Sequence, residues 1–318
     1  MPAGSWGRAW CVTLVACLLA MAGLEATARR HGIRPSWSVG AESWCVEAAA
    51  LGPEDIAILG TSRALSGIEP ATLSRRMGRP AHQLAINATS MLPVLEWLAA
   101  REEFHGVVVA DVTPRLEFRE GLDHHAAAER FVRDFRNFDR SPARVLDSGL
   151  TRIVQTRLAC KSPGFHLLAP YRDRHESGGR LKRMSVDSTR FIRLEFEPGD
   201  GKPDEAEVDV YALTPAAGAE LDRLVERFAA AVRALRRRGA RVVLAHLPVN
   251  GRAAESEDRA MPRRRYWDRL VAATGAEAIH FQDSRALAKF TCPDGEHLDA
   301  SDAVTFTEAL ASALGAHP

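Results

Sequence analysis

The sequence predicts an α/β fold, a three-layer α/β/α sandwich in which helices cover both faces of a five-stranded parallel sheet. From residue 55 onward, short and almost wholly apolar runs alternate with stretches of helical periodicity, which is typical of parallel strands buried on both faces. Of the 318 residues, 46% are hydrophobic and 26% are charged, which is ordinary globular composition. The length suits one large domain, or a core domain that carries an insertion.

Five apolar runs are the expected strands. The first run, DIAIL, ends at Gly60, and the third is apolar apart from Asp111 and stops at a Thr-Pro pair. Runs of this length between turn signals suit buried strands better than helices. The expected strands are 55–59, 81–86, 107–112, 241–247 and 278–281.

The expected helices lie between these strands. Residues 69–77 and 93–103 have apolar positions at helical spacing. A longer helix is expected from Thr214, as an N-cap followed by proline, to Gly239. A last helix is expected over 299–314. Strands that alternate with helices in this way predict a doubly wound sheet of flavodoxin-like order, with ligands bound at the carboxyl ends of the strands.

Residues 115–213 are expected to be a large insertion after the third strand of an α/β domain that covers 55–318. This stretch is rich in arginine and has weak helical patterns over 124–137 and 142–159. Its apolar side chains need burial, so we expect the insertion to pack beside or over the strand ends. These side chains include Phe131, Phe135, Phe138, Leu146, Ile153 and Leu158.

Residues 1–28 are expected to be a signal peptide or a membrane anchor, followed by a linker over 29–54. Residues 9–24 are uncharged and mostly apolar, and at ~1.5 Å per residue they span roughly 24 Å, less than the ~30 Å of a bilayer core. Residues 26–28 read Ala-Thr-Ala, which fits a signal-peptidase site. The third alternative is a buried N-terminal helix.

The compartment is expected to be extracytoplasmic, on the periplasmic side of a membrane. Nothing later in the chain needs a further hydrophobic helix to complete the α/β fold. The positive-inside count opposes this orientation, because Arg29, Arg30 and Arg34 follow the apolar run and only Arg8 precedes it.

Ser62 is the first candidate catalytic residue. It lies just after the first expected strand, at the start of a helix whose free N–H groups can stabilise an oxyanion. One alternative is a serine that caps this helix. Another is the nucleophile elbow of α/β-hydrolases, because Gly60, Ser62 and Ala64 have a similar spacing, although that elbow normally follows several strands.

Asp294 and His297 are the second candidate pair. A separation of three residues lets the carboxylate reach Nδ1–H of the histidine, which leaves Nε2 free to accept a proton from serine. A hydroxyl group needs such a base, because its own pKa lies far above neutrality. An Asp-x-x-His pattern alone is more often a solvated loop.

Together these features resemble the SGNH (GDSL-like) hydrolase family. The first block of that family reads Gly-Asp-Ser, here Gly-Thr-Ser ending at Ser62, and its last block is Asp-x-x-His, here Asp294 and His297. The resemblance covers 55–113 and 214–314 and leaves out the insertion. It implies that the serine is the nucleophile, the histidine its base and the aspartate the group that orients the base.

Two oxyanion-hole positions depart from the family pattern. Ala88, after Asn87, falls where the second block has a glycine whose backbone N–H donates to the oxyanion. The third-block asparagine is missing, and the resemblance leaves the Thr113 hydroxyl or the Asn87 amide to replace it. Loss of one oxyanion donor costs about 10²–10³ in rate.

The resemblance implies a serine esterase or O-acyltransferase that acts on an acyl ester of a cell-envelope glycan or lipid through an acyl-enzyme. In layout the chain looks like membrane-tethered, acyl-handling members of that family. The alternative is a catalytically weak module that binds an envelope glycan or a membrane acyltransferase partner. No cofactor or metal is implied, and the net charge of +1 gives no support for nucleic-acid binding.

Overall fold

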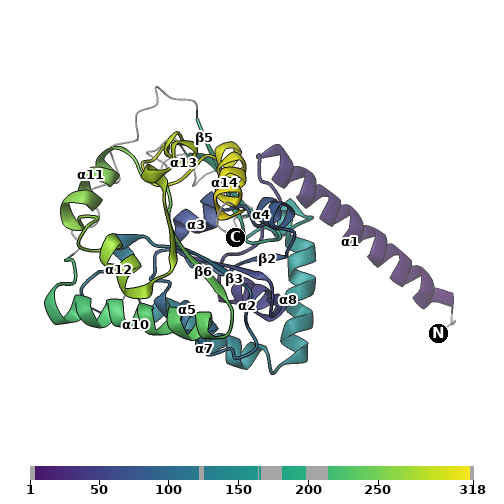
Figure 1. The fold of residues 1–318 in the computed structure, drawn as a ribbon. Helices are drawn as coiled ribbons and strands as arrows, with labels where there is room; N and C mark the ends of the chain where they lie inside the picture. The colour runs from purple at the N-terminus through teal and green to yellow at the C-terminus, as the bar shows by residue number, and fades with distance from the viewer. Residues whose placement is uncertain (1–3, 122–124, 164, 166–180, 198–213, 316–318) are drawn as a thin grey trace.

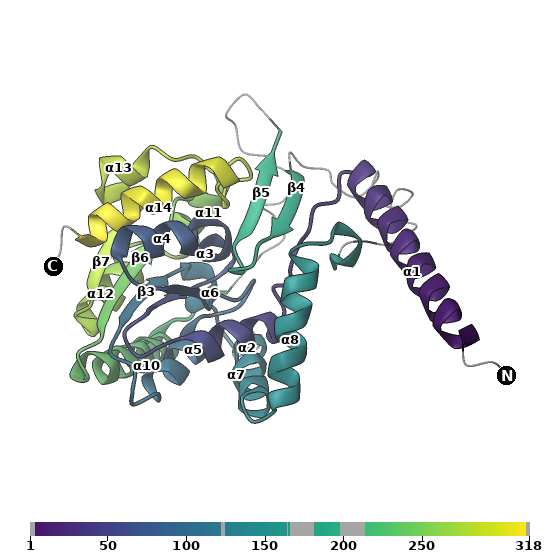
Figure 2. The ribbon, with the colours of Figure 1, turned by 90° about the vertical axis from the view of Figure 1, so that its right-hand side faces the viewer.

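The computed structural model describes residues 4–121, 125–163, 165, 181–197 and 214–315. At its centre all strands of one sheet run parallel, with helices on both faces (Figures 1 and 2). The strands are β1 (Ile56–Leu59), β2 (Ala81–Gln83), β3 (Val107–Asp111), β6 (Arg241–His246) and β7 (Glu277–His280). Their order β2-β1-β3-β6-β7 is that of a flavodoxin-like sheet, so the predicted sandwich is confirmed.

Two helical layers cover the sheet. One layer contains α2 (Ala41–Ala50), α5 (Leu92–Ala99), α10 (Gly218–Arg237) and α12 (Trp267–Thr274). The other contains α3 (Ser62–Gly67), α4 (Pro70–Met77), α11 (Gly251–Ala260), α13 (Arg285–Ala288) and α14 (Ala300–Gly315). Successive residues of a strand point to opposite faces, so Ala57 and Leu59 enter the core of the first layer and Ile56 and Ile58 that of the second.

The longest helix of the sheet layers begins later than the sequence predicts. Thr214 was expected to be its N-cap, but α10 begins at Gly218 with Ala217 in the cap position. The backbone carbonyl of Thr214 instead accepts a hydrogen bond from the backbone N–H of Glu120. The next residue, Pro215, forms an isolated antiparallel β-bridge with Arg119. Tertiary pairing of the backbone therefore overrides the local capping signal.

The stretch 29–54 contains a helix that the sequence analysis did not predict. In α2, Trp44 is fully buried, and its Nε1–H donates to the carbonyl of Leu84 at 2.9 Å. This contact joins the segment before the first strand to the end of β2. The segment is therefore part of the core of the sheet domain.

The insertion 115–213 forms helices beside the sheet and a hairpin. Its described elements are α6 (Pro114–Glu117), α7 (Ala126–Phe138), α8 (Pro142–Gln155), η1 (Ala159–Lys161) and the antiparallel strands β4 (Leu181–Val186) and β5 (Ile192–Phe196). Phe138 is buried as expected. Leu146 and Ile153 are 66% and 58% exposed, so the expectation of burial is wrong for these two side chains. They project from α8 on the side that is not packed against the domain.

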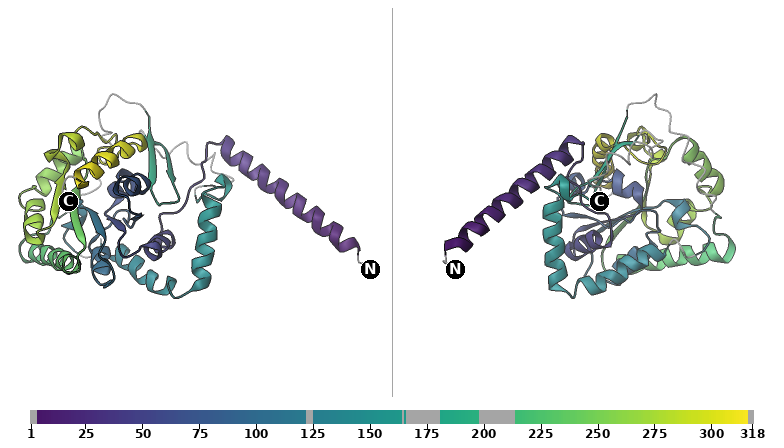
Figure 3. Two further views of the ribbon diagram at one scale, coloured as in Figure 1. Left: turned by 45° about the vertical axis from the view of Figure 1, so that its right-hand side comes forward. Right: turned by 180° about the vertical axis from the view of Figure 1, so that it is seen from behind.

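At the N-terminus, α1 (Gly4–Arg30) is a single helix that projects from the domain (Figure 3). Residues Trp6–Arg30 have a stretch of mean hydropathy 1.9, of which 6% is buried. The alternative of a buried N-terminal helix is therefore wrong. By length and composition the helix is able to cross a membrane, since 25 residues span about 37 Å.

Candidate active site

Ser62 is the first residue of α3, just beyond the carboxyl end of β1, which lies between β2 and β3 in the sheet. The sharp turn before it needs Gly60, which has φ 144° and where a Cβ atom would lie 2.8 Å from the Cβ atoms of Ala64 and Asp111. Thr61 is the N-cap, and its Oγ1 accepts a hydrogen bond from the backbone N–H two residues later. The hydroxyl of Ser62 is therefore not the helix cap.

His297 and Asp294 lie in the loop between α13 and α14, and this loop reaches the start of α3. His297 Nε2 is 2.9 Å from Ser62 Oγ, and its Nδ1 is 2.8 Å from Asp294 Oδ2. Asp294 Oδ1 accepts the backbone N–H groups of Glu296 and His297 at 2.9 and 2.7 Å. One carboxylate therefore holds both the loop and the imidazole, and the three residues predicted from sequence meet in one line.

The electrostatics of this line favour an ionised aspartate. Burial acts to raise the pKa of Asp294, but the hydrogen bond and charge of His297 and the backbone N–H groups outweigh it, so this pKa lies below its ordinary value. The side chains of His297 and Asp294 are 20% and 23% exposed, so the pair lies at the surface of the domain and is partly in contact with solvent.

A network of buried charges that no local sequence pattern predicts lies behind Ser62. Arg63 is 2% exposed, and its guanidinium contacts Glu257 at 2.9 Å and Glu296 at 3.1 Å. Glu296 also pairs with Arg115, and Glu257 contacts His246 Nε2 at 2.8 Å. The sequence shows that Arg63 follows Ser62 and that Glu296 precedes His297. No sequence pattern indicates that Arg63 and Glu296 form an ion pair.

These charges stabilise one another against desolvation. Burial disfavours the charge on Arg63, but Glu257 and Glu296 raise its pKa above the ordinary value. Burial likewise opposes ionisation of Glu257, whose pKa is nevertheless lowered by Arg63 and His246. The network therefore holds the start of α3 and the histidine loop together through charge-assisted hydrogen bonds.

The loop that carries Asn87 and Ala88 is tied to a buried acid. Glu117 is fully buried, and burial raises its pKa to about 8 against the opposing hydrogen bonds from Ser90 and the N–H of Met91. The distances are 2.6 Å to Ser90 Oγ and 3.0 Å to the backbone nitrogen of Met91. At neutral pH the Glu117 carboxyl is therefore mainly protonated and uncharged. Its hydrogen bonds with Ser90 and Met91 hold the loop in place.

Ala88 adopts a backbone conformation that glycine favours. Its φ is 54°, in the left-handed region, and Asn87 and Ala88 form an exposed turn after β2. Thr113 is buried, and its hydroxyl lies 3.0 Å from that of Thr61, the residue before the nucleophile. The structure thus brings Thr113 to the turn that holds Ser62. The oxyanion roles of these residues stay predictions.

One alternative from the sequence is settled by this geometry. In residues 4–55 no strand precedes β1, so the Ser62 turn is not the elbow of an α/β-hydrolase, which follows earlier strands. Within the described ranges, no group of three or more His, Cys, Asp or Glu side chains is arranged to hold a metal ion.

A comparison with protein-family models gives no match, and a comparison with curated proteins finds no significant relative. The chemistry of the site must therefore be argued from its own geometry. A hydroxyl, an imidazole and a carboxylate joined by two hydrogen bonds are the groups that activate serine for attack on a carbonyl carbon.

Proposed function

We propose that this chain is a serine-dependent acyl-transfer enzyme of the SGNH type, with Ser62 as nucleophile, His297 as general base and Asp294 as the group that orients it. The single observation that carries this proposal is the continuous line from Ser62 Oγ through both ring nitrogens of His297 to Asp294 Oδ2. A base within about 2.6–3.2 Å of the hydroxyl is what general-base catalysis requires.

In the first half-reaction, Ser62 Oγ attacks the carbonyl carbon of an ester while its proton moves to His297 Nε2. Asp294 stabilises the imidazolium that forms. Collapse of the tetrahedral intermediate breaks the bond to the alcohol oxygen, and the alcohol leaves with the proton from His297. The product is an acyl-serine, and the base is again neutral.

In the second half-reaction, a new hydroxyl group attacks the acyl-serine and gives its proton to His297. Collapse of this tetrahedral intermediate breaks the bond between the acyl carbon and Ser62 Oγ, and Oγ takes the proton back from His297. Water as acceptor makes the protein an esterase, and a sugar hydroxyl makes it an O-acyltransferase. The substrate class that we propose is an acyl ester of a cell-envelope glycan or lipid, on the grounds of the family resemblance and of a site outside the cytoplasmic membrane.

The junction of α1 with the domain supports an uncleaved anchor. Glu25 accepts hydrogen bonds from the backbone N–H groups of Ala159 and Cys160, and Ala28 is fully buried. Cleavage after Ala28 would remove these contacts. We therefore propose that the domain stays tethered on the periplasmic side of the membrane.

The alternative is a catalytically weak module that binds an envelope glycan or a membrane acyltransferase partner. One observation favours it: Thr113 stands where the family has an asparagine donor, and its hydroxyl bonds to Thr61. A site with one weakened oxyanion donor loses about 10²–10³ in rate.

The test uses the full chain in detergent, a fluorophosphonate probe and p-nitrophenyl acetate. We expect labelling and ester hydrolysis in the wild type, and loss of both in Ser62→Ala. Ser312→Ala is the matched control, because Ser312 is exposed on α14 and its hydroxyl bonds only within that helix in the contacts described. Absence of labelling in folded wild-type protein would overturn the enzyme proposal and favour the binding module.

A further inference from the structure

The helix α8 is packed with its polar face inward. Ser148 donates to Glu42 at 2.6 Å, and the guanidinium of Arg152 lies 3.4 Å from Glu47 and over the ring of Trp37. Five apolar side chains of α8 are exposed, and we call four of them, at helical spacing, the α8 stripe; the fifth is Val145. The α8 stripe consists of Leu146, Leu150, Ile153 and Val154, with exposed fractions of 66%, 54%, 58% and 39%. A surface helix of a soluble domain has the opposite arrangement.

The helix α8 lies on the side of the domain that carries the candidate membrane helix. In Figures 1, 2 and 3, α8 stands at the side of the domain from which α1 projects. The chain passes from α8 almost directly into η1, whose N–H groups at Ala159 and Cys160 bind Glu25 in the last turns of α1. Arg29 of α1 also donates to the carbonyl of Arg157, two residues beyond α8. The last turns of α1 are thus fixed to the segment that directly follows α8.

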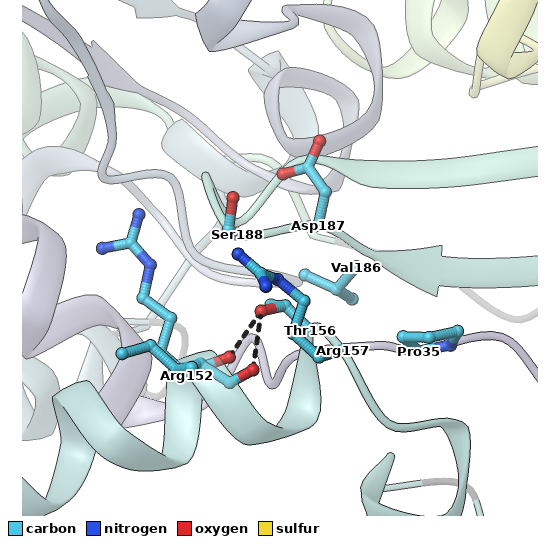
Figure 4. A pocket seen from close by; sticks show the side chains of 8 residues that line it. Pro35, Arg152, Thr156, Arg157, Val186, Asp187 and Ser188 are labelled. Atoms are coloured by element: carbon cyan, nitrogen blue, oxygen red, sulfur yellow. Dashed lines mark hydrogen bonds between the residues drawn. The ribbon is translucent and has the colours of Figure 1, made fainter. Parts of the chain in front are cut away.

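A cavity of about 430 Å³ opens at this end of α8. Arg152 and Arg157 line one side of it, and Asp187 and Ser188 of the β4–β5 turn line the other (Figure 4). Asp187 is held by its own turn, because its Oδ1 accepts the N–H and hydroxyl of the residue two places later. Ile153 belongs to both the stripe and the cavity wall, so an apolar surface and two guanidinium groups meet there.

We propose that α8 and this cavity form a second membrane contact, which binds an anionic phospholipid bilayer. The α8 stripe lies in the boundary between headgroups and acyl chains, as the apolar face of an interfacial helix does. Arg152 and Arg157 bind the phosphate of a lipid headgroup, whose charge complements theirs. With α1 as the first attachment, a second one restrains rotation of the domain and sets the height of its catalytic site above the bilayer.

The test places an environment-sensitive fluorophore on the stripe of the full chain in lipid nanodiscs. Leu150→Cys carries the label, in a background where the two exposed cysteines, Cys11 and Cys17, are alanine; the other three cysteines are buried. Glu255→Cys is the matched control, exposed on α11 at the far side of the domain (Figure 1). With lipids brominated on the acyl chains, we expect a blue shift and at least about twofold quenching at position 150, and neither at 255.

Two results would overturn the membrane contact. One is a label at position 150 that stays solvent-exposed in nanodiscs, and the other is a label that is shielded without quenching, which would assign the face to a protein. For the headgroup site, quenching is expected to rise when phosphatidylglycerol is added to phosphatidylcholine, and Arg157→Gln should remove this rise. Equal quenching in both lipids would refute the proposed preference for an anionic headgroup. The melting temperature of each variant, followed by circular dichroism, reports whether it is folded, independently of any reactivity of Ser62.

Discussion

Asp294→Asn should switch off the nucleophile through the tautomer of His297. Asp294 Oδ1 accepts two backbone N–H groups at 2.9 and 2.7 Å, so the amide oxygen of asparagine must take that place. The amide nitrogen then occupies the place of Oδ2, 2.8 Å from Nδ1 of the ring. Because two N–H groups cannot hydrogen-bond to each other, the ring proton moves to Nε2. That nitrogen is then unable to accept the proton of Ser62.

The expected loss is about 10⁴-fold in the rate of serine acylation, the size seen when a triad carboxylate becomes an amide, and it corresponds to about 5.5 kcal/mol of activation free energy. The fold should change little, because both backbone hydrogen bonds to the loop are kept. A modest fall in melting temperature is expected, since the lowered pKa of Asp294 shows that its ionised form is stabilised by the folded state.

The assay is the second-order rate constant for fluorophosphonate labelling, with the ¹⁵N shifts of His297 as a readout of its tautomer. Asp302→Asn is the matched control, the same change at a carboxylate in the first turn of α14. A labelling rate for Asp294→Asn within about tenfold of the wild type, or a ring that keeps its proton on Nδ1, would refute the reasoning.

Two further predictions concern the buried charges. In the folded protein the pKa of Glu117 is raised from 4.5 to about 8, so the unfolded chain loses this proton first as the pH rises. The free energy of unfolding of the wild type should therefore fall between these two pH values. Glu117→Gln should flatten this fall when unfolding in urea is measured across the range, and parallel pH profiles of the two proteins would contradict the prediction. Arg63→Leu should lower the free energy of unfolding by roughly 3–5 kcal/mol, because buried Glu257 loses its cation. A loss below about 1 kcal/mol would show that the remaining partners of the network suffice.

The sheet and the catalytic line were predictable because their signals are local. Each strand is a short apolar run. The hydrophobic effect favours burial of such a run whichever strand lies beside it. Asp294 and His297 are three residues apart, and Ser62 follows the first strand, so the order of the parallel strands sufficed to bring them to one edge.

Other features depend on which elements become neighbours. Arg63 and Glu257 are separated by 194 residues, and no local pattern pairs them. The N-cap signal at Thr214 was overridden because the backbone there found a partner in a distant segment.

The sequence by itself determined the strands, the parallel sheet and the three residues that meet in one hydrogen-bonded line, Ser62, His297 and Asp294. Only the tertiary structure decided the burial of Trp44, the charge network behind Ser62 and the outward face of α8. Apolar spacing shows that a helix has two faces, as in the stretch that contains Leu146 and Ile153. Which face packs against the domain depends on the polar partners on the neighbouring helix. Here Glu42 and Glu47 of α2 contact Ser148 and Arg152, so the polar face of α8 packs inward.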